Sequence, residues 1–145
     1  MSINRALDIS VTGILAEKAH MEVIASNIAN INTTKSVGGG PYKRMVPQYS
    51  EVPLSFENQL SKAQKKIANK TGGVAVKVVE DNSSPAQKVY NPGHPDADLN
   101  GYVSLPNVSL ATEMTDLVYS SQLYGANITV FNASKKMGQD ALSIQ

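Results

Sequence analysis

The sequence contains no cysteine and no tryptophan, and its charges of opposite sign nearly cancel. Without cysteine the chain has no disulfide bond, no thiol nucleophile and no zinc site built on thiolates. The formal net charge is +1, from 13 basic and 12 acidic residues. Such a balance gives no general attraction to nucleic acid or to an anionic membrane. We therefore expect no nucleic-acid partner.

Long hydrophobic runs are also missing. A membrane-spanning helix needs roughly 20 consecutive apolar residues, and no stretch of the chain provides them, so we expect no direct membrane insertion. The amino-terminal stretch MSINRALDIS lacks a basic segment followed by an apolar run and a small-residue cleavage site. It is therefore not expected to act as an ordinary secretory signal peptide.

Proline is absent from both ends of the chain. All seven prolines lie between Pro41 and Pro106, and the flanking segments contain only isolated glycines. Because proline and glycine interrupt helices, this distribution predicts one long helix at each end and a turn-rich middle. We divide the chain accordingly into residues 1–35, 36–107 and 108–145.

The two end segments carry apolar residues at alternating steps of four and three, which is typical of a helix with a buried stripe. The stripe of the first segment is Leu7, Val11, Ile14, Met21, Ala25 and Ile28, and that of the second is Leu110, Met114, Leu117, Tyr124, Ile128, Phe131 and Leu142. These steps average the 3.5-residue period of a left-handed supercoil. We predict an antiparallel coiled coil of the two end helices, with an ordinary helical hairpin packed on its own sheet as the alternative.

The middle segment has the shorter period of β-strands. Residues 42–52, 72–81 and 101–105 carry β-branched and aromatic runs bounded by glycine, proline or serine, so each is predicted to be a strand. Pro47 indicates an edge or a bulge in the first strand. Residues 54–70 fit a short helix or a loop. The predicted fold class is α+β, with a small β-rich module inserted between the end helices.

One stretch of the middle segment imitates a calcium-binding loop. Asp96, Asp98, Asn100 and Gly101 reproduce the D-x-D-x-N-G opening of an EF-hand. The twelfth position, however, is Asn107 instead of a bidentate glutamate, and the preceding NPGHP cannot form the entering helix. We predict that these side chains stabilise successive turns through their own backbone, with calcium binding as the alternative.

No group of residues suggests catalysis. The only histidines are His20 and His94, and neither has the spacing of a standard zinc motif. The serines lack a nucleophile elbow. We predict no catalytic residue, no metal site and no cofactor, and hence no enzyme.

Two stretches resemble one known family. Gly13 followed by VIASNIANINTT resembles the amino-terminal signature of bacterial flagellar rod, hook and related axial proteins. YNPGHPDADLNGYVSLPNV, with EMTDLVYSSQLYGANITVFNASKKM after it, is similar to the proximal-rod members of that family. The resemblance covers nearly the whole chain and is least from Glu51 to Thr71, whose role it leaves open.

The resemblance implies a structural subunit of the proximal rod of the flagellar basal body. Such a subunit polymerises helically into the drive shaft that transmits torque across the periplasm, and the flagellar type III apparatus exports it without signal cleavage. The implied partners are the rod proteins FlgB, FlgF, FlgG and FliE, copies of the chain and the export apparatus. The alternatives are another flagellar axial component, a calcium-binding module and a helical adaptor.

An assembly of this kind offers an explanation for the asparagines near the end of the first helix. Asparagine is a poor helix former because its amide competes for backbone hydrogen bonds. We hypothesise that Asn27 and Asn30 bond neighbouring groups in the assembly and set axial register; the alternative is that they fray and cap the helix. The predicted subunit-packing residues are Leu7, Val11, Ile14, Met21, Ile24, Asn27, Ile28, Asn30, Leu117, Tyr124, Ile128 and Phe131.

Overall fold

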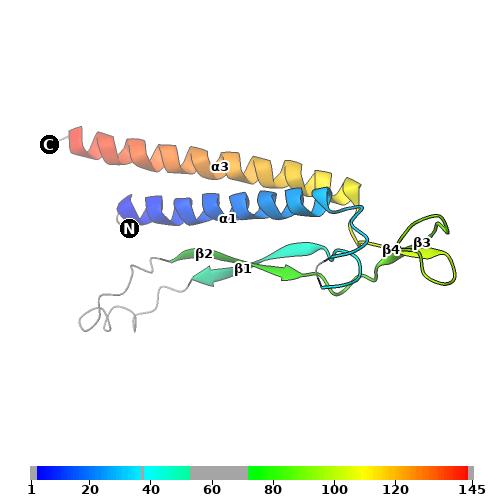
Figure 1. The fold of residues 1–145 in the computed structure, drawn as a ribbon. Helices are drawn as coiled ribbons and strands as arrows, with labels where there is room; N and C mark the ends of the chain where they lie inside the picture. Colours follow the sequence, from blue (N-terminus) through cyan, green and yellow to red (C-terminus); the bar gives the residue numbers. More distant parts are fainter. Residues whose placement is uncertain (1–2, 37, 53–71, 144–145) are drawn as a thin grey trace, which may run out of the picture. The chain divides into compact units, whose positions relative to one another are not determined.

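The computed structural model describes residues 3–36, 38–52 and 72–143. It contains one long helix toward each end of the chain and four short strands between them (Figure 1). The elements are α1 (Ile3–Ala29), β1 (Met45–Val52), β2 (Gly73–Glu80), β3 (Gln87–Tyr90), β4 (Tyr102–Leu105) and α3 (Leu110–Ser143). The predicted α+β class, with a small β module between two end helices, is confirmed.

The described residues form two compact units. Unit 1 comprises the described residues within 1–19, 49–77 and 120–145, and unit 2 those within 20–48 and 78–119. Both helices contribute to both units, because the unit boundaries fall inside them. Neither helix, over its described length, is apolar enough to cross a membrane.

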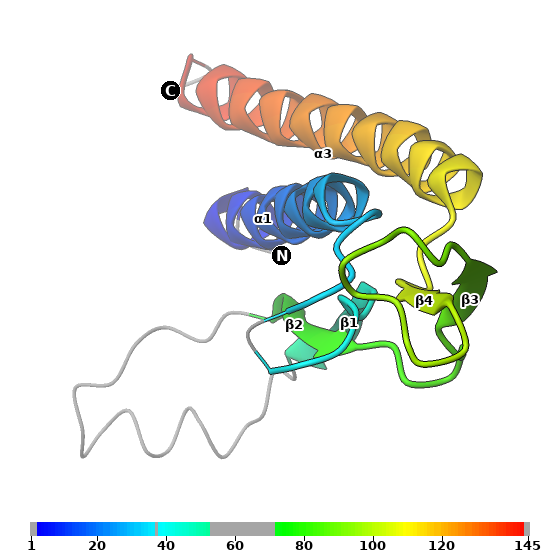
Figure 2. The same ribbon diagram turned by 45° about the vertical axis from the view of Figure 1, so that its right-hand side comes forward.

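In unit 1, α1 and α3 lie side by side and run in opposite directions (Figures 1 and 2). The Oγ atom of Ser120 donates a hydrogen bond of 2.7 Å to Oε2 of Glu17. One helical turn earlier in α1, a Cβ atom at Gly13 would lie 3.2 Å from Nδ2 of Asn127. Residues nearer the amino end of α1 therefore face residues nearer the carboxyl end of α3, as expected for antiparallel helices.

In unit 2, β3 and β4 form an antiparallel hairpin in which Tyr90 faces Tyr102 and Val89 faces Val103. Val103 is buried, as are Val23, Ile24 and Val108 of the same unit. Tyr90 and Tyr102 are both exposed and stack edge to face at 5.3 Å between ring centroids. The hairpin therefore turns one apolar side chain into the core and two aromatic rings toward solvent.

The strand predictions were right for β1, β2 and β4, and they missed β3. The missed strand has only four residues and lies directly before NPGHP. The turn residues that follow it led to the whole stretch being interpreted as turns. β1 and β2 form a two-stranded sheet in which each strand is an edge, and this accommodates Pro47. The predicted helix or loop at residues 54–70 lies outside the described residues.

The predicted apolar stripe does not form the most buried face of α3. Leu110, Met114 and Leu142 are exposed in the single chain, Leu142 by 75%, so their burial in a seam stays a prediction for the assembly. The buried side chains of α3 are Glu113, Ser120 and Ser134. The coiled coil stays a prediction: the helices pair antiparallel, but no supercoil is established by these contacts.

The buried residues of α3 follow a seven-residue repeat, as the predicted apolar stripe does. The periodicity of the sequence is therefore the same for both faces, and this is why the stripe was chosen instead. Glu113, Ser120 and Ser134 share their repeat with Asn127, the residue that faces Gly13. Small side chains on one face let two helix backbones approach closely, whereas larger apolar side chains on the neighbouring face do not. The helices therefore pair through a small and polar face.

Candidate functional site

Asn27 of unit 2 is 1% exposed and makes four hydrogen bonds through its side chain. Its Nδ2 donates to the carbonyl oxygen of Met45 at 2.8 Å and to Oε2 of Glu113 at 3.0 Å. Its Oδ1 accepts from the backbone N–H of Met45 at 2.9 Å and from the hydroxyl of Tyr42 at 3.0 Å. The amide thus pairs with the backbone of β1 as another strand would, and all its hydrogen-bonding capacity is used within the chain.

Arg44 supplies the charge that the buried carboxylate of Glu113 requires. Its Nε lies 2.6 Å from Oε1 of Glu113, which is completely buried, and its Nη2 lies 3.3 Å from Oδ2 of Asp116. Nη1 is 4.0 Å from Oδ2 of Asp81. Both oxygens of Glu113 therefore have a partner, Arg44 on one and Asn27 on the other. A buried charge is tolerated only when it is satisfied in this way.

Asn107 joins the segment before α3 to the same cluster. Its Oδ1 accepts from the backbone N–H of Arg44 at 2.9 Å, and its Nδ2 donates to the carbonyl oxygens of Asp81 and Ser84 at 3.3 Å each. We call Asn27, Tyr42, Arg44, Asp81, Asn107, Glu113 and Asp116 the polar cluster. It connects α1, the start of β1, the turn after β2 and the start of α3 within unit 2.

The carboxyl of Asp81 in the polar cluster has a lowered pKa. Hydrogen bonds from the side chain and backbone of Ser83 hold the pKa of its carboxyl below the usual range, and the charge of Arg44 acts in the same direction. The carboxylate therefore stays ionised at neutral pH. The turn after β2 presents a negative charge to Arg44.

In the described part of unit 1, side-chain hydrogen bonds also link separate elements. Beyond the bond between Ser120 and Glu17, the hydroxyl of Thr12 donates to the carbonyl oxygen of Ile9 at 2.7 Å and accepts from the backbone N–H of Val74 at 3.2 Å. A Cβ at Gly73 would collide with the side chain of Thr12. The absence of a side chain at this position therefore allows the start of β2 to lie against α1.

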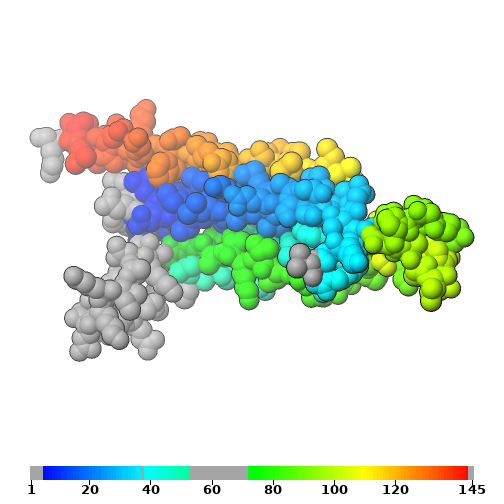
Figure 3. Space-filling view, viewed as in Figure 1, coloured from blue at the N-terminus to red at the C-terminus, as the bar shows by residue number. Residues whose placement is uncertain are grey.

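The second candidate functional feature is the exposed face of α3. In the space-filling view its side chains, coloured yellow through red, lie at the surface (Figure 3). No charged residue occurs between Asp116 and Lys135. The exposed large apolar side chains of the helix are Leu110, Met114, Leu117, Val118, Tyr119, Val130, Met137 and Leu142. Because an α-helix turns by about 100° per residue, these side chains lie on two sides of α3, with the buried positions between them. We call this set the α3 apolar face.

The predicted packing residues are distributed over three environments. Ile24 and Asn27 are buried, and Val11 and Leu117 are exposed. The others are partly buried: Leu7, Ile14, Met21, Ile28, Asn30, Tyr124, Ile128 and Phe131. A single chain contains no contact between subunits, so their role in packing stays a prediction.

Asn27 and Asn30, the two asparagines near the end of α1, have different surroundings. Asn27 bonds its own chain, as described above. The side chain of Asn30 donates to the carbonyl oxygen of Ser26 at 2.9 Å and accepts from the hydroxyl of Thr33 at 3.2 Å, just beyond the end of α1. The capping alternative therefore describes Asn30 in the single chain.

Gly125 of α3 has no atom within 4 Å of the position where its Cβ would be. The close approach between the helices occurs instead at Gly13, opposite Asn127.

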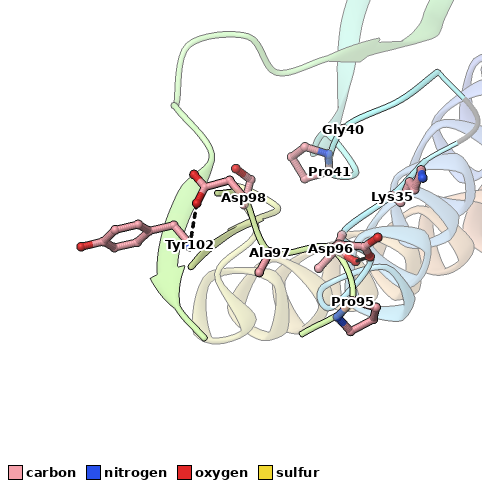
Figure 4. A pocket seen from close by; sticks show the side chains of 10 residues that line it. Lys35, Gly40, Pro41, Pro95, Asp96, Ala97, Asp98 and Tyr102 are labelled. Carbon is pink, nitrogen blue, oxygen red and sulfur yellow. Dashed lines mark hydrogen bonds between the residues drawn. The ribbon is translucent and has the colours of Figure 1, made fainter. Parts of the chain in front are cut away.

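The EF-hand-like stretch forms turns, as the backbone interpretation predicted. Oδ1 of Asp98 accepts from the backbone N–H groups of Asn100 and Tyr102 at 2.9 Å each, and Oδ2 of Asp96 accepts from the hydroxyl of Thr34 at 2.7 Å. A hollow of about 420 Å³ lies beside them, between the 34–41 segment and the 95–104 segment (Figure 4). Throughout the described ranges, no three metal-binding side chains are grouped closely enough to hold an ion.

Sequence reasoning missed most of the polar cluster. Arg44 was part of a predicted strand, and Glu113 lies in the first turn of α3, where an acidic residue is expected on electrostatic grounds alone. Neither position has a sequence signal for burial, because the pairing partners are 69 residues apart. Asn27 was noticed only because it is a poor helix former.

Comparison with protein families gives two matches, one at each end of the chain. Residues 7–35 match a family described as "Flagella basal body rod protein". Residues 99–144 match a family described as "Flagellar basal body rod FlgEFG protein C-terminal". The first match contains most of α1, and the second contains β4 and α3.

Curated relatives match over nearly the full length. Each of the following is named flagellar basal-body rod protein FlgC. The relative from Bacillus subtilis is 37% identical, with 99% of both chains covered. The relative from Borreliella burgdorferi is 35% identical, with 99% of this chain and 98% of the relative covered. The relative from Salmonella typhimurium is 34% identical, again with 99% and 98% covered.

Proposed function

The chain belongs to the FlgC family of flagellar basal-body rod proteins, and from this membership we propose how its surfaces serve the rod. It is a structural subunit of the basal-body rod. We propose that it polymerises helically with copies of itself and with other rod proteins, and that the resulting proximal rod transmits torque across the periplasm. The polymer is built through the end helices.

The α3 apolar face is the observation that carries this proposal. A helix that leaves so many large apolar side chains in water normally has a partner for them. The segment between Asp116 and Lys135 has no charge on any side, so neighbouring helices can cover it without burying an ion. Helix-to-helix packing between subunits supplies that cover.

The predicted packing residues take two roles in this proposal. Val11 and Leu117 are exposed and available to a neighbouring subunit. Ile24 and Asn27 are buried within the chain and hold α1 in place, so they act on packing indirectly. The ranges 1–35 and 108–145 then contribute the helical part of the rod, and 36–107 the β-rich part.

Family membership also supports a proposal about individual partner proteins. We propose contacts with FlgB, FlgF, FlgG and FliE in the assembled rod, and passage through the flagellar type III export apparatus before assembly. The relatives carry the names of rod proteins, so we propose a purely structural role without catalysis. No cofactor is needed for such a role.

A charge on the α3 apolar face tests the proposal. Val118 is 58% exposed, so Val118→Asp should leave the free chain as stable as the parent, within about 0.5 kcal/mol. In the assembled rod the same carboxylate would be buried without a partner. We expect cells with Val118→Asp to make the protein but to lack a completed rod and not to swim.

Val118→Thr is the matched control, because it keeps the branched shape and adds no charge. It should assemble and support swimming. Circular dichroism and urea unfolding of both purified variants separate assembly defects from folding defects. Normal swimming and complete basal bodies in Val118→Asp cells would show that this part of α3 does not pack against another subunit.

A further inference from the structure

We propose that Asn100 is a site of spontaneous deamidation, and that the folded turn restrains the reaction. Asn100 is the only asparagine in the sequence that glycine follows. It lies in the exposed loop between β3 and β4. The inference depends on this loop alone and not on the proposed function.

The reaction requires only the chain and water. The backbone nitrogen of Gly101 attacks Cγ of Asn100, a nitrogen–carbon bond forms, and the side-chain nitrogen leaves as ammonia with the displaced proton. Water then opens the cyclic imide at either carbonyl and yields aspartate or isoaspartate. Gly101 favours the attack because it has no side chain to hinder the approach of its nitrogen.

The folded loop withholds this nitrogen. The N–H of Gly101 donates to the carbonyl oxygen of Asp98 at 2.9 Å, and the N–H of Asp98 donates to the carbonyl oxygen of Tyr102 at 2.8 Å. Oδ1 of Asp98 also accepts from the backbone of Asn100 and of Tyr102, the second of these bonds being drawn in Figure 4. Cyclisation must therefore break the bond at Gly101 and distort a loop that Asp98 holds at three other points.

Gly101 itself limits how far the loop can adapt. Its φ of +80° is favourable only for glycine, and a Cβ there would lie 2.9 Å from the ring of Tyr90. Isoaspartate at position 100 would insert an extra carbon into the backbone at this point. The pairing of Tyr90 with Tyr102 could then no longer close in its register. A chain that reacts before it folds would therefore lose the hairpin.

Peptide mapping by mass spectrometry tests the site and its restraint together. The purified full-length chain is incubated at mildly alkaline pH, once in buffer and once unfolded in urea. Conversion at Asn100 should be at least about tenfold faster in urea, since in the folded chain the Gly101 nitrogen can attack only after local opening of the loop. Asn91 is an internal control, because Pro92 has no N–H with which to attack.

Two variants sharpen the test. Asp98→Ala removes the carboxylate that holds the loop, so conversion in buffer should rise toward the rate in urea. Asn100→Gln should abolish the product in both conditions, because the longer side chain forms the ring far less readily. Equal rates for the parent chain in buffer and in urea would refute the restraint, and no conversion at Asn100 in urea would refute the site.

Discussion

The same two helices are joined by different chemistry in the two units. Among the described residues, unit 2 buries the apolar side chains Val23, Ile24, Val103 and Val108, whereas unit 1 buries only Ala16. Unit 2 also contains the polar cluster. The helices in unit 1 meet through small and polar positions such as Gly13 and Ser120.

This difference indicates where the chain holds itself together and where it needs other chains. Burial of apolar area supplies most of the free energy of folding, and the described residues of unit 1 show little such burial. Its part of α3 nevertheless exposes Val130, Met137 and Leu142. We infer that unit 2 is the more stable part of the free chain, and that unit 1 gains stability when a neighbour covers α3.

Hydrogen exchange of the free chain offers the largest contrast. Opening free energies range from near zero in weakly packed regions up to the global value in the core. We expect the amides of α3 beyond Ser120 to exchange much faster than those between Glu113 and Tyr119. Equal protection along the whole helix would contradict the comparison.

Breaking the ion pair of unit 2 should have the largest effect of any single substitution. Arg44→Ala leaves the buried Glu113 carboxylate without its cation, and loss of one partner of a buried pair costs about 3–5 kcal/mol. Urea unfolding measures the loss. Adding Glu113→Ala to Arg44→Ala should recover part of it, because the unpaired charge is then gone. Additive losses would show that the two side chains act independently.

Asn27→Ala should cost somewhat less, because it removes a neutral group. The backbone of Met45 and the second oxygen of Glu113 would lose their partner, at about 1–3 kcal/mol for unsatisfied buried groups. Asn30→Ala is the matched control one turn later, at the end of the helix, and should cost under about 1 kcal/mol. Similar losses in the two variants would mean that the cluster is not the main constraint on α1.

Glycine substitutions compare the two faces of the helices in unit 1. Gly125→Ala should stabilise the free chain by about 1 kcal/mol, because alanine favours the helix and the site is open. Gly13→Ala gains the same helix preference, but its Cβ would lie 3.2 Å from Asn127, so we expect little or no net gain. Thermal unfolding of both variants measures the difference in stability. Equal stabilisation by the two substitutions would show that Asn127 does not lie close enough to Gly13 to hinder a Cβ atom there.

Removing the charge of Asp81 should produce the smallest effect. The pKa of Asp81 is lowered in the folded state, so its contribution is present above the unfolded pKa of about 3.9 and is lost as pH falls through the folded value. Asp81→Asn should flatten this part of the pH dependence of the urea midpoint. If the urea midpoint of Asp81→Asn falls with pH as it does in the parent chain, other carboxylates cause the loss of stability in acid.

Local patterns in the sequence predicted much of the fold and little of the polar cluster. The turn residues from Asn91 to Gly101 were recognised because asparagine, aspartate, glycine and proline favour turns whatever surrounds them. The pairing of Arg44 with Glu113 could not be recognised, because it joins a strand to a helix far along the chain. The role of Asn27 was only half anticipated: its amide needed partners, and the partners are in its own chain.

The sequence by itself determined that both ends are helical and that the middle is strands and turns. The confinement of proline to the middle and the apolar periodicity of the ends are local properties, so they hold before any tertiary contact forms. Only the tertiary structure decided which face of α3 turns inward. Leu110, Leu117, Tyr124 and Phe131 share one seven-residue repeat, and Glu113, Ser120, Asn127 and Ser134 share another. Because both repeats have the same period, periodicity does not show which of the two faces is buried. The second face is buried because its small side chains fit closely against α1 and because Arg44 supplies a positive charge beside Glu113.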